Sequence, residues 1–139
     1  MIDSFKGENR FLSSFWPCEV ELDGVTYESV EHAYQAAKTV VPEEREKFRY
    51  AATAGIAKRL GRSVTMRDDW DDVKLSVMRD LVTQKFSDPS LRALLDETKG
   101  KQLVEGNHWG DVFWGVCKGK GENHLGKILM EVRDADQDN

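Results

Sequence analysis

Residues 29–38 read SVEHAYQAAK, and this stretch predicts a helix with an abrupt start. Ser29 is a favourable N-cap, because its hydroxyl can accept a hydrogen bond from a backbone N–H that has no partner within the helix. At about 100° per residue, the apolar side chains of the stretch fall on one face. They are Val30, Ala33, Tyr34 and Ala37. We therefore expect this helix to pack against the core along that face.

A row of polar side chains runs beside the apolar face. Glu31, Gln35 and Lys38 recur at i, i+4 and i+7, so a carboxylate, an amide and an ammonium line up at the edge of the expected core. Glu31 lies in the first turn, where the helix dipole favours the ionised form. Such a carboxylate can act as a base or stabilise a cation. The same pattern is also typical of a solvated helix edge, and both interpretations stand at this point.

Length and composition indicate one globular domain over residues 1–139, with a substantial core. The net charge of −5 argues against broad electrostatic binding to nucleic acid and leaves room only for a local basic site. Two cysteines, Cys18 and Cys117, are typical of a cytoplasmic protein with free thiols. Neither an apolar signal run nor a stretch of ~20 apolar residues is present, so we expect no membrane segment. Composition carries no prediction of oligomeric state.

The remaining patterns predict an α+β fold that is rich in helix and has a few short strands. Alternation around Asp23-Gly24 predicts a hairpin over residues 19–27, and residues 102–105 predict a short strand. Further helices are expected at about 42–52, 53–60, 71–86, 88–98 and 123–134. Residues 1–18 and the tail 134–139 read as irregular.

Two of these helices carry more detailed expectations. Gly61 is expected to end the helix at 53–60. The helix at 71–86 has the longest periodic pattern, and its buried arc is expected to hold Leu75, Val77, Met78, Leu81, Val82 and Phe86.

A glycine-rich stretch over residues 106–123 is the second informative feature. Its glycines permit close backbone approach to a ligand, and Trp109 and Trp114 offer flat surfaces for stacking. Lys118 and Lys120 precede a helix start, which predicts a phosphate site on the backbone N–H groups of 121–123. The alternative is an ordinary loop whose tryptophans pack into the core.

Other residues leave their roles open. Trp70 is either a core residue or a wall on which a heterocycle stacks. The histidines and cysteines form no local ligand pair, so we expect no metal site. A cysteine nucleophile working with His32 or His124 has no local motif to support it.

These stretches together resemble the NADAR family of YbiA-like or RibX-like N-glycosidases. The resemblance runs from Phe5 to Arg133. It rests on ordered motifs at residues 11–15, 23–38, 57–62, 69–71, 73–79, 85–86, 109–115 and 119–126.

The resemblance implies a YbiA-like fold and hydrolysis of an N-glycosidic bond, with no cofactor. The implied substrates are phosphoribosylamino-pyrimidine intermediates of riboflavin synthesis or ADP-ribose attached to guanine, including guanine in nucleic acid. A non-enzymatic module that binds ADP-ribose or an NAD-derived nucleotide is the main alternative. A structural or partner-binding domain is a third interpretation.

The resemblance also implies roles for particular residues. Glu31 resembles, by its place in the motif, the catalytic carboxylate of the family. Asp111 is a weaker second candidate for a catalytic carboxylate. The implied substrate-binding residues are Ser13, Gln35, Lys38, Trp70, Trp109, Asp111, Trp114, Gly115, Lys120 and Asn123. Two positions depart from the family pattern. Ser14 stands where asparagine is frequent, and Val116 stands where riboflavin-linked members carry aspartate.

Overall fold

The computed structural model describes residues 1–135, which form two compact units. We call Ser14–Lys85 the continuous unit, and residues 1–13 together with 86–135 the split unit. Of the tail expected to be irregular, 136–139 lie outside the described residues. None of the helices within residues 1–135 is long and apolar enough to cross a membrane. The predicted fold class is confirmed, since helices dominate and the strands are few and short.

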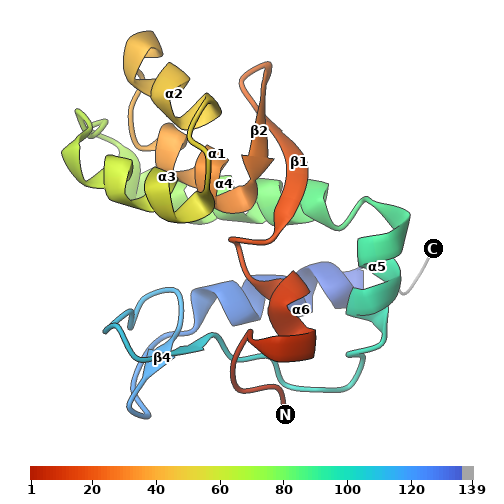
Figure 1. Ribbon diagram of the computed structural model, residues 1–139. Helices are drawn as coiled ribbons and strands as arrows, with labels where there is room; N and C mark the ends of the chain where they lie inside the picture. Colours follow the sequence, from red (N-terminus) through yellow and green to blue (C-terminus); the bar gives the residue numbers. More distant parts are fainter. Residues whose placement is uncertain (136–139) are drawn as a thin grey trace. The chain divides into compact units, whose positions relative to one another are not determined.

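In the continuous unit a β-hairpin is followed by four helices and a short 3-10 turn (Figure 1). The elements are β1 (Pro17–Leu22), β2 (Val25–Ser29), α1 (Val30–Ala37), α2 (Pro42–Arg49), α3 (Ala54–Leu60), η2 (Gly61–Ser63) and α4 (Trp70–Lys85). The strands pair antiparallel around Asp23 and Gly24, whose positive φ angles of 49° and 84° suit a tight hairpin turn. The predicted hairpin is thereby confirmed.

Helix α1 lies at the centre of the continuous unit. It packs against α2, α3, α4 and both strands, and all eight of its residues are buried. The Ser29 Oγ accepts from the backbone N–H of His32 at 3.1 Å, which confirms the predicted N-cap. The helix therefore has a polar row but no solvated edge, because neighbouring elements cover its whole circumference.

Helix α3 ends at Leu60 with Gly61 as its C-cap, as predicted, although Gly61 has a helical φ of −61° and the chain continues into η2. The predicted end of α2 and the predicted burial of Leu75 are wrong. Helix α2 ends at Arg49 rather than near residue 52. On α4, Leu75 is 37% exposed, since the part of the helix near it faces solvent. Tertiary packing, which the periodicity of the sequence does not encode, decides where α2 ends and whether Leu75 is buried.

In the split unit, two separated pieces of sequence join. Its elements are η1 (Gly7–Leu12), α5 (Pro89–Asp96), β3 (Gly106–Asn107), β4 (Val116–Cys117) and α6 (His124–Ala135). The strand predicted at 102–105 is wrong, since only Leu103 forms a bridge there, to Ile2. The parallel pair β3–β4 instead lies inside the glycine-rich stretch. This pairing joins residues ten apart, which no local pattern indicates.

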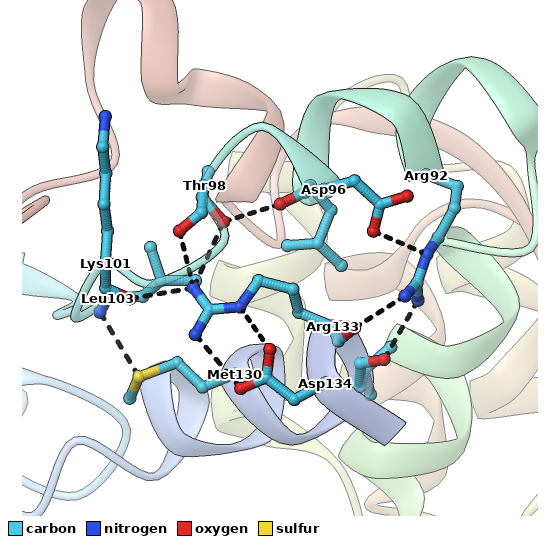
Figure 2. Close-up of polar contacts among 10 residues, drawn as sticks. Arg92, Asp96, Thr98, Lys101, Leu103, Met130, Arg133 and Asp134 are labelled. Carbon is cyan, nitrogen blue, oxygen red and sulfur yellow. Dashed lines mark hydrogen bonds and ion pairs between the residues drawn. The ribbon is translucent and has the colours of Figure 1, made fainter. Parts of the chain in front are cut away.

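Two arginines connect the end of α6 to α5 and to the loop that follows α5, through hydrogen bonds (Figure 2). Arg133, 4% exposed, donates to the backbone oxygens of Thr98 at 3.0 Å and Lys101 at 2.8 Å. Arg92 donates to the backbone oxygens of Val132 and Arg133 at 3.0 and 2.6 Å. The bonds from Arg92 satisfy carbonyl groups that the last turn of α6 leaves without partners within the helix. Those from Arg133 hold the loop after α5.

A buried lysine ends α4. Lys85 is only 2% exposed, and burial lowers its pKa to about 8, with a smaller opposing influence from Cys18. The adjacent Gln84 holds this end of the helix on β1, exchanging bonds of 2.7 and 2.9 Å with the backbone of Glu21.

Lys85→Met is expected to alter how stability depends on pH. The lowered pKa means that the folded chain binds fewer protons than the unfolded chain between about pH 8 and the ordinary lysine pKa of about 10.5. Stability should therefore rise with pH through this window, by roughly 3 kcal/mol from this group. The methionine variant should lack that rise and be the more stable protein at pH 7. Urea unfolding of both proteins from pH 7 to 10 measures the difference, and parallel curves would contradict it.

Candidate active site in the continuous unit

Glu31 is a carboxylate held in a largely buried position. It is 8% exposed, and its backbone N–H donates to the carbonyl of Ser14 at 3.0 Å. Its Oε2 accepts from Nε2 of Gln35, one turn along α1, at 2.6 Å. Gln35 is itself only 4% exposed. The interpretation of this row as a solvated helix edge is therefore wrong.

Gly61 leaves the space that Gln35 occupies. A Cβ atom at position 61 would lie 1.8 Å from Oε1 of Gln35 and 2.7 Å from its Cδ, far inside contact distance. Within residues 1–135, Oε1 of Gln35 has no hydrogen-bond partner. The amide is thus oriented by its bond to Glu31 alone, and α3–η2 closes over its other side. Gln35 therefore orients the Glu31 carboxylate, and its implied contact with the substrate stays a prediction.

An aromatic pair, Tyr34 and Trp70, and the side chain of Lys38 lie close to one another at α1. The rings of Tyr34 and Trp70 have centres 5.2 Å apart and planes inclined by 56°. The Nζ of Lys38 lies 5.8 Å from the centre of the Tyr34 ring. Burial is the main cause of a lowered pKa for Lys38, and the negative charge of Glu31 opposes it. The predicted group Glu31, Gln35, Lys38 and Trp70 is therefore brought together.

Trp70→Ala should affect both stability and substrate binding. The indole is 5% exposed at the start of α4, so truncation should cost about 3–5 kcal/mol of folding free energy. If its ring also contacts substrate, KM should rise for the folded fraction, while Trp70→Phe should keep part of the activity. Urea unfolding and steady-state kinetics separate the two effects. An unchanged KM in folded Trp70→Ala would leave Trp70 as a core residue.

His32 has a structural role. It is 3% exposed, with Nδ1 2.6 Å from Oγ of Ser29 and Nε2 3.0 Å from the carbonyl of Ala51. Both ring nitrogens are thus engaged, and His32 is unsuited to activate a cysteine. A hollow of about 720 Å³ lies beside it, lined by the hairpin and residues 52–54, and neither Glu31 nor Trp70 lines it. In the described part of the chain, no three His, Cys, Asp or Glu side chains gather to hold a metal.

The predicted site residues of the split unit shape its loop. Oδ1 of Asp111 accepts from the backbone N–H groups of Phe113 at 3.2 Å and Trp114 at 2.9 Å. Asn123, which is buried, accepts from the N–H of Glu105 and donates to the carbonyl of Leu103. These bonds fix the backbone of the loop. Asp111 and Asn123 therefore each have a structural role in addition to the substrate contact that was predicted for them.

Other predicted residues of this unit differ in exposure. Trp109 is 51% exposed, whereas Trp114 is half-buried and packs edge-on against Phe113, 4.8 Å between ring centres. Gly115 is buried where a Cβ would lie 2.1 Å from the carbonyl oxygen of Glu105. Lys120 is exposed, and Ser13 is half-buried at the end of η1.

Two of the three backbone N–H groups predicted to form a phosphate cradle at residues 121–123 are engaged elsewhere. Backbone N–H groups there donate to carbonyl groups of the preceding loop instead of pointing to solvent. The pairs are Glu122 to Val112 at 2.7 Å, Asn123 to Gly115 at 3.3 Å, His124 to Phe113 at 3.1 Å and Leu125 to Trp114 at 3.0 Å. The loop thus folds back over the helix start and caps it, so the N–H groups of Glu122 and Asn123 already have acceptors.

Sequence reasoning missed residues that accompany Glu31. Gly61 was interpreted as a helix terminator, and Tyr34 only as a core residue. Three cations near Lys38 were given no functional role by the sequence analysis, namely Lys58, Arg62 and Lys74. The motif at 57–62 contains two of them and was the available signal.

The comparisons define the class of protein. A model of the NADAR domain matches residues 3–135, and the chain therefore belongs to the NADAR family. The chain is 40% identical over 123 residues to N-glycosidase YbiA of Escherichia coli (strain K12), covering 86% of this chain and 75% of that protein. It is also 40% identical over 130 residues to an N-glycosidase of Nostoc punctiforme, covering 88% and 83% of the two chains.

Two further relatives extend this result. A riboflavin biosynthesis protein of Vibrio vulnificus is 40% identical over 129 residues, which are 89% of this chain and only 35% of that protein. The NMR structure of the E. coli protein YbiA matches with a TM-score of 0.83 and 35% identity, covering 97% of this chain and 86% of that one. The predicted family and fold are both confirmed.

Proposed function

We propose that this protein is an N-glycosidase and that Glu31 is its catalytic carboxylate. Membership of the NADAR family and the N-glycosidase names of its relatives support the reaction class. The observation that carries the residue assignment is the buried carboxylate of Glu31, oriented by Gln35 and near an aromatic pair and Lys38. Hydrolysis of a phosphoribosylated or ADP-ribosylated heterocycle is the activity that fits these groups best.

The chemistry of the bond gives Glu31 its task. When the bond between C1′ of ribose and the heterocycle nitrogen breaks, the electron pair leaves with the nitrogen and positive charge develops on the ribose. An ionised carboxylate stabilises that charge and can take a proton from the attacking water. Water oxygen then bonds to C1′, and the heterocycle gains a proton. The hydrogen bond from Gln35 holds the Glu31 carboxylate in a fixed orientation, which both roles need.

Mass spectrometry with three substrates tests the proposal. Purified protein is incubated with a phosphoribosylamino-pyrimidine, with DNA that carries ADP-ribosylated guanine, and with NAD. Free base together with the matching sugar phosphate is the expected product from one of the first two. Binding of ADP-ribose without product from any of the three would support the non-enzymatic module instead.

A further inference from the structure

We propose that four cations of the continuous unit bind the phosphate group of the substrate, an inference that rests on the proposed function. The four, which we call the Lys38 cluster, are Lys38, Lys58, Arg62 and Lys74. The ligand class is a phosphate monoester or diphosphate attached to ribose. This assignment places phosphate recognition in the same unit as Glu31, in place of the loop before α6.

The cluster is drawn from four separate elements. Lys38 follows α1, Lys58 lies on α3, Arg62 on η2 and Lys74 on α4. The charges of the other three members act on Lys38 and add to the lowering of its pKa by burial. Glu31 is the negative charge that opposes them. Lys38 thus lies within electrostatic reach of three other cations and one carboxylate, an arrangement that a bound anion would stabilise.

Local contacts fix the positions of the cluster. The carbonyl of Lys38 accepts from the N–H of Arg67 at 2.7 Å, which ties the end of α1 to the segment before α4. Lys74 lies one turn after Trp70 and pairs with Asp71 at 3.2 Å. Arg62 follows directly on Gly61, which lies against Gln35. Lys38, Arg62 and Lys74 therefore border the aromatic pair or the polar row of α1, and the Nζ of Lys58 lies 5.9 Å from the centre of the Phe15 ring.

Two members retain their charge for a ligand. Within residues 1–135, neither Lys38 nor Arg62 makes an ion pair. Phosphate accepts several charge-assisted hydrogen bonds, from arginine in a fork and from lysine as a point charge. In the loop before α6, by contrast, two of the three backbone donors expected for phosphate, those of Glu122 and Asn123, already donate to carbonyl groups. The positive charge without an ion-pair partner at Lys38 and Arg62, and the engaged donors of the loop, both favour the Lys38 cluster over the loop before α6 as the phosphate site.

Calorimetric titration with inorganic pyrophosphate tests the proposal without relying on turnover. Pyrophosphate should bind the parent protein, more weakly as salt is raised. Arg62→Gln and Lys38→Met should each weaken the Kd at least tenfold. Arg59→Gln is the matched control, because Arg59 is exposed on α3, bears the same charge and does not act on Lys38. Its Kd should stay within about twofold of the parent value.

Other outcomes overturn the proposal. Absence of pyrophosphate binding by the parent protein would do so. So would equal weakening by Arg59→Gln and Arg62→Gln, or loss of binding confined to a Lys118→Met/Lys120→Met variant. Failure of the proposed function is recognised separately. A parent that binds pyrophosphate through the cluster but releases no base keeps the binding site and loses the N-glycosidase assignment. If the parent protein turns over its substrate and Arg62→Gln leaves KM unchanged, the N-glycosidase assignment stands and the proposed phosphate site is lost.

Discussion

Glu31→Gln is expected to lower kcat by a factor of about a hundred or more while leaving KM little changed. The variant keeps the shape of the side chain, and its amide oxygen can still accept from Gln35. It loses the negative charge, whose stabilisation of the ribose cation exists only in the transition state. Steady-state kinetics on the substrate that mass spectrometry identifies measures the change.

Glu43→Gln provides the matched control for this prediction. Glu43 is also a first-turn glutamate, on α2, but it is exposed. Its replacement should leave kcat unaltered. Stability should change little in either variant, because the dipole interaction of a first-turn glutamate is worth about 0.3–1 kcal/mol. If Glu31→Gln keeps more than half the parent rate, Glu31 is structural and Asp111 is the next carboxylate to replace.

Gly61→Ala should have the second largest effect on activity. Position 61 has ordinary helical backbone angles, so alanine there introduces no backbone strain. The added methyl group nevertheless overlaps the Gln35 amide and must displace it, which disturbs the bond that orients Glu31. A displacement of about 1 Å in a catalytic group can reduce turnover about a hundredfold. Kinetics should show the loss in kcat, and unfolding should show a cost of about 1–3 kcal/mol from overpacking.

Gly55→Ala separates this effect from the general consequence of replacing a helical glycine. Gly55 lies in the neighbouring α3, where an added Cβ would meet only Oγ1 of Thr53, at an ordinary 3.8 Å. This variant should be fully active and more stable by about 0.4–1 kcal/mol. If Gly61→Ala behaves in the same way, the packing of Gly61 on Gln35 has no role in catalysis.

The sequence predicts the local devices of the fold well. The Asp23-Gly24 turn and the N-cap at Ser29 form as expected, because each depends on a few neighbouring residues. The end of α3 at Leu60, directly before Gly61, also forms as expected. The helix end predicted near residue 52 was misplaced, since α2 ends at Arg49 and packing from elsewhere decides that boundary. The short β3–β4 pair was missed for the same reason.

The candidate site was predictable in part. The spacing of Glu31, Gln35 and Lys38 placed them in one row, but spacing alone could not distinguish a buried row from a solvated one. Burial came from the elements around α1, whose arrangement no single segment encodes. The phosphate prediction misjudged two of its three backbone donors, because residue types before α6 suggested open N–H groups, whereas the loop folds back on itself and uses those of Glu122 and Asn123.

The division into a continuous and a split unit has a consequence for biosynthesis. All of the residues of the continuous unit have been synthesised once the ribosome has added Lys85. The split unit must wait, because Ile2 pairs with Gln102 and Val104 through bonds of 2.9 and 2.8 Å. During translation its first thirteen residues are therefore held without their partners while the segment after them folds. Domains generally fold as units in the order of their synthesis, so Glu31 and its neighbours should be in place before the chain is complete.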